Sequence, residues 1–303
     1  MRVDVHQHIW TEPLLAALTR RSSLPLVQRR DGLTVLHSAG ERAYVIDVDA
    51  ESPQKRRRRN QDDGVDVALI AISSPIGIES LPRAQADPLI DAHLEGIGAL
   101  GPGFAAWGPV ALDAARPADI DQALARGCIG ISLPADALSD HDALAALAPL
   151  LQRVTEAMVP LLIHPGCARA RLEASLTEPL WWRAMTDYVA QMQAAWLSFA
   201  TLGRREHPEL VVVFAMLAGG APLLTERLGA RGGPAIDLRD PLTFYDTSSF
   251  GPEALDAMAR RVGAGQLVYG SDRPVAEPTV TGYDSSLKRN ASQLLAPIAS
   301  VAA

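Results

Sequence analysis

Two histidines near the N-terminus are the first residues whose types and spacing suggest chemistry. His6 and His8 follow Val3 and Val5 in a short alternating run that is typical of a β-strand. In an extended strand, alternate side chains point to the same face and lie roughly 6 to 7 Å apart along the chain. One divalent metal ion can therefore take a nitrogen atom from each imidazole.

Two later apolar segments also end on a potential metal ligand. Residues 161–164 read Leu-Leu-Ile-His, and residues 267–272 read Leu-Val-Tyr-Gly-Ser-Asp. The imidazoles of His6, His8 and His164 and the carboxylate of Asp272 form a ligand set for Zn²⁺ or a similar divalent ion, with one coordination position left for water. A metal in such a site lowers the pKa of its bound water toward about 7, and Asp272 is suited to accept the proton.

The elements that must position these residues alternate regularly along the chain. After the N-terminal strand, near-continuous apolar strands are expected at residues 65–72, 104–110, 128–133, 160–164, 210–216, 243–248 and 267–272, each followed by a helical pattern. Such strands indicate parallel pairing with both faces of the sheet covered. We therefore predict an α/β fold: a (β/α)8 TIM barrel in a single domain that spans residues 1–303.

The ligand candidates all stand at strand ends, and the carboxyl ends of the strands carry the active site in such a barrel. Strands 1 and 8 are neighbours, and strand 5 faces strand 1 across the barrel. The four side chains can therefore converge on the barrel axis. Asp246, at the end of the seventh strand, is a further candidate, although the sequence Asp-Thr-Ser-Ser also suits a turn.

A long connection, residues 9 to about 51, follows the first strand. Within it, residues 32–37 and 41–46 predict a β-hairpin closed by the three-residue turn Ser38-Ala39-Gly40. An insertion after strand 1 would hang over the active-site face of the barrel. His37, at the end of the first hairpin strand, is therefore a candidate catalytic residue.

Composition and charge exclude several classes of partner. The formal net charge is −7, which argues against a nucleic-acid backbone, and the basic run at residues 55–59 is interpreted as a solvated helix face. No stretch of about 18 apolar residues occurs, and the N-terminus has no apolar signal-peptide run. Two cysteines are too few for a disulfide framework. We expect a cytoplasmic protein with a small-molecule substrate and no nucleic-acid or membrane partner, and a homodimer stays open.

Six short motifs, in order along nearly the whole chain, resemble one family. They are Val-Asp-Val-His-Gln-His at 3–8, Leu-Ile-His-Pro at 162–165, His-Pro-Glu-Leu at 207–210, Leu-Ala-Gly-Gly at 217–220, Tyr-Asp-Thr-Ser-Ser at 245–249 and Tyr-Gly-Ser-Asp-Arg-Pro at 269–274. The chain is thereby similar to the metal-dependent amidohydrolase superfamily, in the amidohydrolase-related branch that includes aminocarboxymuconate-semialdehyde decarboxylase. The resemblance implies one metal ion bound by His6, His8, His164 and Asp272. Zn²⁺ is the first choice, and Mn²⁺, Fe²⁺ and Co²⁺ stay open because these ligands do not separate them.

One position departs from the family pattern. Where the family has a histidine at the end of strand 6, this chain has Met216. A thioether has no titratable proton, so Met216 cannot replace an imidazole as a general base. His37, Asp246 and Arg273 are candidates to take over this role. The predicted catalytic set is Asp272, His164, His37 and Asp246.

Three functional hypotheses remain. The leading one is a hydrolase that uses metal-activated water on an amide, lactone or related carbonyl. The second is a nonoxidative decarboxylase of an aromatic or enoic acid, and the third is a barrel that binds a ligand without turnover. Arg273, Arg42 and Arg29 are candidate partners of a substrate carboxylate.

The remaining histidines and aromatic residues receive structural interpretations. His93, His141 and His207 lie on or before helices, and single helices are expected at about 141–157 and 180–202. Trp181 and Trp182 belong to the second of these helices, where an aromatic stripe more often packs in the core.

Overall fold

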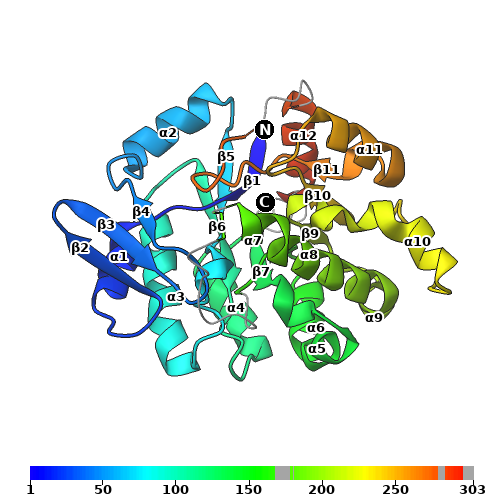
Figure 1. Ribbon diagram of the computed structural model, residues 1–303, viewed down its shortest axis with the longest axis horizontal. Coiled ribbons are helices and arrows are strands. Elements are labelled where there is room, and N and C mark those ends of the chain that lie inside the picture. Colours follow the sequence, from blue (N-terminus) through cyan, green and yellow to red (C-terminus); the bar gives the residue numbers. More distant parts are fainter. Residues whose placement is uncertain (168–177, 180, 279–283, 296–303) are drawn as a thin grey trace.

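Eight parallel strands follow one another around a barrel with helices outside them (Figure 1). The computed structural model describes residues 1–167, 178–179, 181–278 and 284–295. The segment directly after β11 closes onto β1 through backbone hydrogen bonds: Val5 N donates to Tyr269 O at 2.9 Å, and Asp272 N donates to His6 O at 2.8 Å. The predicted TIM barrel is therefore confirmed. The strands are β1 (Val3–Gln7), β5 (Val67–Ile70), β6 (Phe104–Pro109), β7 (Gly130–Pro134), β8 (Leu161–His164), β9 (Val212–Phe214), β10 (Thr243–Asp246) and β11 (Leu267–Val268).

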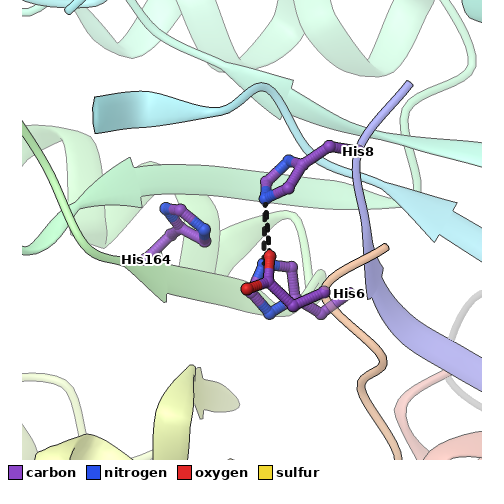
Figure 2. Close-up of side chains that lie close together, drawn as sticks. His6, His8 and His164 are labelled. Carbon is purple, nitrogen blue, oxygen red and sulfur yellow. Dashed lines mark hydrogen bonds and ion pairs between the residues drawn. The ribbon is translucent and has the colours of Figure 1, made fainter. Parts of the chain in front are cut away.

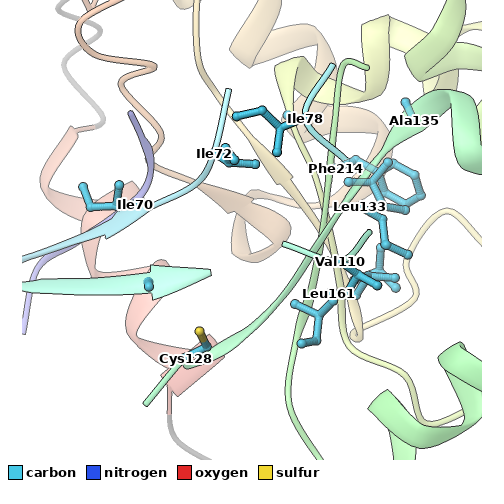
Figure 3. Close-up of a cluster of buried hydrophobic side chains, with 14 of the residues drawn as sticks. Ile70, Ile72, Ile78, Val110, Cys128, Leu133, Ala135, Leu161 and Phe214 are labelled. Carbon is cyan, nitrogen blue, oxygen red and sulfur yellow. The ribbon is translucent and has the colours of Figure 1, made fainter. Parts of the chain in front are cut away.

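Apolar side chains fill the barrel and the layer between its strands and helices. Val5 on β1 and Leu162 on β8 share one buried cluster, which strands on opposite sides of a barrel can form only through its interior. Leu161 and Phe214 belong to the cluster on the other side of the strands, part of which Figure 3 shows. Every residue of β1 and β8 is buried, as expected for parallel strands that are covered on both faces.

Helices cover the outside of the barrel, and two of them are shorter than the sequence pattern predicts. The helix expected at 141–157 is two helices, because Pro149 cannot donate a helical hydrogen bond and fits only a first turn. None of the described helices is long and apolar enough to cross a membrane. The helices outside the insertion are α2 (Pro53–Asp62), α3 (Arg83–Gly98), α4 (Pro117–Ala125), α5 (His141–Ala146), α6 (Ala148–Glu156), α7 (Trp182–Met185), α8 (Asp187–Ser198), α9 (Arg204–Glu206), α10 (Thr225–Ala230), α11 (Pro252–Val262) and α12 (Asp284–Asn290).

The helix expected at 180–202 is also interrupted, and its residue 180 lies outside the described residues. Helix α7 ends at Met185, α8 follows, and a π-helical turn spans Phe199–Gly203. Trp196 is buried in the core, but Trp181 and Trp182 are 58% and 39% exposed. The prediction that this tryptophan pair packs in the core is wrong, because α7 lies at the surface beside the barrel mouth.

The insertion after β1 is larger than the predicted hairpin. It contains helix α1 (Glu12–Thr19) and an antiparallel sheet in the order β2 (Leu26–Arg30), β3 (Leu33–His37) and β4 (Tyr44–Ile46). Strands β3 and β4 form the predicted hairpin, but residues 38–43 connect them, so the three-residue turn is wrong. Strand β2 was not predicted, although Asp31 and Gly32, both with positive φ, form the two-residue turn that joins it to β3.

A buried carboxylate holds both ends of the insertion against the barrel. Glu51, near the end of the insertion, accepts a hydrogen bond from the backbone of Trp10, at its start, at 3.0 Å. Arg56, on α2, donates to both oxygens of Glu51 at 3.1 Å and to Gln7 on β1 at 2.7 Å. Because Glu51 and Arg56 are both buried, this ion pair fixes where the insertion leaves and rejoins the barrel.

Candidate metal centre and its cavity

Three imidazoles and one carboxylate meet at the carboxyl ends of the barrel strands. His6 and His8 come from β1 and the residue after it, His164 ends β8, and Asp272 follows β11. One ligand atom from each of the four lies within 4.8 Å of the others. The three rings are mutually perpendicular and point toward one another (Figure 2). The structure thus brings together all four predicted metal ligands.

The distances within this group allow the side chains to share one metal ion. The Nε2 atoms of His6 and His8 are 3.2 Å apart, and Asp272 Oδ1 lies 3.2 Å from His8 Nε2 and 3.5 Å from His6 Nε2. Two metal–nitrogen bonds of about 2.0 to 2.1 Å at a tetrahedral angle separate their nitrogens by roughly 3.3 Å. The donor set therefore fits Zn²⁺ or a metal of similar size.

Each imidazole is held by a hydrogen bond from its other nitrogen. Nδ1 of His6 donates to Asp246 at 2.7 Å, Nδ1 of His8 to the Ala71 carbonyl at 2.9 Å, and Nδ1 of His164 to the Pro165 carbonyl at 2.8 Å. A carbonyl or carboxylate oxygen can only accept, so the proton is assigned to Nδ1 and the Nε2 lone pairs face the centre. Lone pairs this close repel one another unless a cation or a proton lies between them, which again favours a bound metal.

Charges around the group attract a cation. Burial lowers the pKa of His6, but the carboxylates of Asp246, Asp272 and Asp4 outweigh burial and raise this pKa to about 9. Burial and the adjacent imidazoles of His6 and His8 hold the pKa of His164 well below its usual range. Without a metal ion the carboxylates thus favour a positive charge on His6, and a bound cation would take the place of that extra proton.

Asp246 is part of this support and does not line the cavity. It is fully buried, and besides His6 Nδ1 it accepts a hydrogen bond from Ser248 N at 2.7 Å. Burial raises the pKa of Asp246, but His6 and the Ser248 hydrogen bonds outweigh it and lower the pKa, so the carboxylate stays ionised. A Cβ atom at Gly270 would lie 2.8 Å from the Asp246 carboxyl carbon, which explains the glycine there. Asp246 can orient His6 but cannot reach a substrate.

Asp4 is a supporting residue that the sequence reasoning missed. Its buried carboxylate accepts hydrogen bonds from His6 N at 3.1 Å and Ser271 N at 3.0 Å, so it joins β1 to the segment that carries Asp272. Burial raises the pKa of Asp4. Asp272 itself has a φ of 57°, a left-handed backbone that non-glycine residues seldom adopt. An aspartate two residues before the first histidine, on the same strand face, was the available signal.

A cavity of about 540 Å³ opens above the four ligands. Its wall is contributed by the barrel mouth, by the insertion and by residues after β8, and much of it is apolar. The insertion thus overlies the active-site face, as predicted. The wall residues outside the ligand group include Trp10, Leu36, Glu41, Arg42, Tyr44, Val45, Ile76, Arg183, Tyr188, Met216 and Val275.

Met216 occupies the wall position where the family pattern has a histidine. It begins a run of five residues, 216–220, that all have positive φ. The run ends in two glycines, and a Cβ atom at Gly219 would lie 2.7 Å from Val189 O on α8. This left-handed turn holds the Met216 thioether in the cavity wall, where it offers no proton to a substrate.

Several predicted site residues lie elsewhere. His37 is on β3 and is not among the cavity-lining residues, so the structure does not bring it to the site. Arg273 pairs with Asp63 and Glu277, and Arg29 pairs with Glu12, again off the cavity. Of the three arginines proposed for a substrate carboxylate, only Arg42 lines the cavity.

A second polar group on the wall was not predicted. Glu41, Arg183 and Tyr188 all line the cavity, and Glu41 accepts hydrogen bonds from both of the others. Glu41 belongs to the hairpin expected to cover the mouth, and that was the available signal. Its partners are more than a hundred residues away along the chain, so no local pattern could pair them.

A family model described as amidohydrolase matches residues 3–295. The chain belongs to the amidohydrolase family. The match agrees with the barrel and with the histidine and aspartate residues at its strand ends. No curated protein sequence matches this amidohydrolase-family chain.

Solved structures with the same fold include enzymes. IDCase from Metarhizium anisopliae is 18% identical with a TM-score of 0.67, and the superposition covers 98% of this chain and 91% of that one. The 5-carboxyvanillate decarboxylase from Sphingomonas paucimobilis is 14% identical with a TM-score of 0.67, over 98% of this chain and 99% of that one. A dihydroxybenzoic acid decarboxylase from Polaromonas, with bound manganese and 2-nitroresorcinol, is 14% identical with a TM-score of 0.63, over 97% and 96%. At these identities the likeness shows the fold.

Proposed function

We propose that this amidohydrolase-family chain is a metal-dependent nonoxidative decarboxylase of an aromatic or enoic acid. The observation that carries the proposal is the placement of three imidazoles and one carboxylate within 4.8 Å at the base of a largely apolar cavity. The decarboxylases that share its fold support the proposal, including one with bound manganese. They favour decarboxylation over the hydrolysis that the sequence motifs put first.

His6, His8, His164 and Asp272 would hold the ion. A bound divalent ion supplies a Lewis acid that fixes an oxygen of the substrate and draws electron density from the reacting carbon. Three imidazoles and one carboxylate make Zn²⁺ our first choice, and the manganese of the Polaromonas enzyme makes Mn²⁺ the alternative.

The residues of this chain would then act on the substrate in two ways. Trp10, Leu36 and Ile76 line the cavity with apolar surface, which would favour conversion of a charged carboxylate into neutral CO₂. As the bond between the carboxylate and its carbon breaks, the electron pair stays on that carbon. Asp272 would take one proton from solvent at the open end of the cavity and pass it to that carbon, which leaves the Asp272 carboxylate ionised as before.

The methionine at position 216 also fits this reaction. Decarboxylation needs one proton delivered to one carbon atom, so a single acid beside the reacting centre suffices. Asp272 is that acid, and Met216 has no proton to contribute.

Hydrolysis is the second candidate, and one observation favours it. Asp272 lines the cavity, and its Oδ1 lies 3.2 Å from His8 Nε2, so the carboxylate is placed where it could act on a water molecule that the metal would activate. It could take a proton from that water and pass it to a leaving group.

A product assay in D₂O separates these candidates. Metal-loaded protein is incubated with hydroxybenzoates, enoic diacids, lactones and amides, and CO₂ release and products are followed by NMR. We expect CO₂ release with one deuterium at the vacated carbon, and loss of both in Asp272→Asn. Ring opening or amide cleavage without CO₂ would establish hydrolysis instead. Binding without any product would leave a barrel that binds but does not turn over.

A further inference from the structure

A carboxylate from the insertion is fixed in the cavity wall by two residues that follow β8. Glu41 lies on the connection between β3 and β4, in residues 38–43. Its Oε1 accepts a hydrogen bond from Arg183 Nη1 on α7 at 2.9 Å and another from the Tyr188 hydroxyl on α8 at 2.9 Å. The insertion is thereby joined to the other side of the cavity mouth at one atom.

The arrangement leaves the second oxygen of Glu41 available to a ligand. Both hydrogen bonds use Oε1, and no described residue donates to Oε2. The Glu41 side chain is 23% exposed and lines the cavity, whereas the Arg183 side chain is only 8% exposed. Oε2 is therefore the carboxylate atom that can accept a hydrogen bond from a bound molecule.

Its two partners hold Glu41 rigidly. Arg183 Nε also lies 3.7 Å from a carboxylate oxygen of Asp187, so the charge of its guanidinium is close to two carboxylates. Burial, with the charges of Glu41 and Asp272, raises the pKa of the Tyr188 hydroxyl, which therefore stays protonated and keeps donating to Glu41. A carboxylate oriented in advance loses little freedom when a ligand binds, which strengthens its hydrogen bond to that ligand.

We infer that Glu41 determines substrate specificity by accepting a hydrogen bond from a hydroxyl or amino group of the substrate. Glu41 is not one of the four residues that meet at the metal centre, so this contact is made by a different part of the substrate. Its charge repels the substrate carboxylate, which is left to the metal centre. The inference rests on the proposed function, which places the substrate carboxylate at the metal centre. It adds that the substrate also carries a hydroxyl or amino group.

Arg42, the neighbour of Glu41, does not account for the same preference. It is exposed and lines the cavity, so its charge attracts any anionic ligand to the mouth. Two acids that differ only in a donor group feel this attraction equally. A ratio of their affinities therefore isolates the contact with Glu41.

Binding affinities, rather than reaction rates, test the inference. The three hydroxybenzoate isomers and their methoxy analogues are titrated into Zn²⁺-loaded protein by calorimetry. We expect at least one isomer to bind about tenfold or more tightly than its methoxy analogue, the range for a hydrogen bond to a charged group. In Glu41→Gln this ratio should fall below about threefold, because both acids lose the same repulsion but only the hydroxy acid loses the hydrogen bond.

Three further variants complete the experiment. Glu41→Asp keeps the charge on a side chain shorter by one methylene group, and it should also lose the preference for the hydroxybenzoate. Tyr188→Phe removes one of the two donors that orient Glu41, and it should lose part of that preference. Glu12→Gln removes an exposed carboxylate from the same insertion and should change nothing. Circular dichroism checks that each variant is folded.

The outcomes that overturn the inference differ from those that overturn the proposed function. The role of Glu41 is refuted if wild-type protein binds each hydroxybenzoate and its methoxy analogue equally tightly. It is also refuted if Glu41→Gln leaves the ratio of these affinities unchanged, or if no acid binds. A clear preference combined with absent CO₂ release refutes decarboxylation and leaves the role of Glu41 standing.

Discussion

The base of the cavity and its outer wall differ in how they are held. At the base, His6, His8 and His164 are 1%, 2% and 4% exposed, and each is fixed by a hydrogen bond to barrel backbone or a buried carboxylate. On the wall, Tyr44 and Val45 of the insertion are 39% and 54% exposed. The barrel strands hold the base, whereas part of the wall belongs to an insertion at the surface.

This difference assigns separate tasks to the two regions. Ligand atoms that must meet within a few tenths of an ångström need a rigid setting, which the strand ends provide. A surface insertion can change in length and sequence without disturbing that geometry, so it is suited to select the substrate. Substitutions at the base should therefore affect metal binding, and substitutions on the wall should affect ligand choice.

Removal of a ligand at the base is expected to have the largest effect. His8→Ala deletes one of the four donors, and we expect metal affinity to fall by more than about 100-fold. Loss of a residue that only orients a ligand already costs about 10- to 100-fold. Metal analysis of the purified protein should find the variant nearly empty. His141→Ala, at an exposed histidine, is the control, and full occupancy in His8→Ala would refute the assigned ligand set.

Breaking the junction between the two regions should have the next largest effect. Glu51→Ala leaves the buried guanidinium of Arg56 without its partner and frees the Trp10 backbone amide. Loss of one partner of a buried pair destabilises by about 3 to 5 kcal/mol, so thermal unfolding should shift down by roughly 5 to 15 °C. Glu12→Ala, which breaks an exposed pair in the same insertion, should shift it little. Equal melting temperatures for both variants would show that Glu51 is not the anchor.

The sequence predicted the base of the cavity much better than its wall. Each metal ligand stands at the end of a short apolar strand, and barrel geometry places all strand ends together, so His164 could be related to His6 without knowledge of any contact. The role of Asp246 depends on which way its side chain points. The sequence places Asp246 at a strand end, but it does not tell whether the side chain lines the cavity or instead hydrogen-bonds to His6.

The wall depends on contacts that no local pattern contains. Only Val27 of β2 is buried, so that strand lacks the apolar run that revealed the barrel strands. Glu41 meets Arg183 across 142 positions, through the packing of an insertion against α7. The left-handed turn that begins at Met216 is likewise set by its packing against α8, because backbone sterics alone disfavour it.

Asp246→Asn is expected to have the smallest effect, and it tests whether the barrel alone holds the base of the cavity. Asp246→Asn keeps the size of the side chain but removes the negative charge of the carboxylate that accepts the hydrogen bond from His6 Nδ1. We expect metal affinity to fall by about 10- to 100-fold, measured by competition with a chromogenic chelator. Asp237→Asn, the same change at an exposed site before β10, should leave affinity unchanged. No insertion atom takes part in this contact. Once metal is restored at saturating concentration, Asp246→Asn should therefore keep the wild-type preference for hydroxybenzoates, and loss of that preference would mean that the base and the wall are not independent.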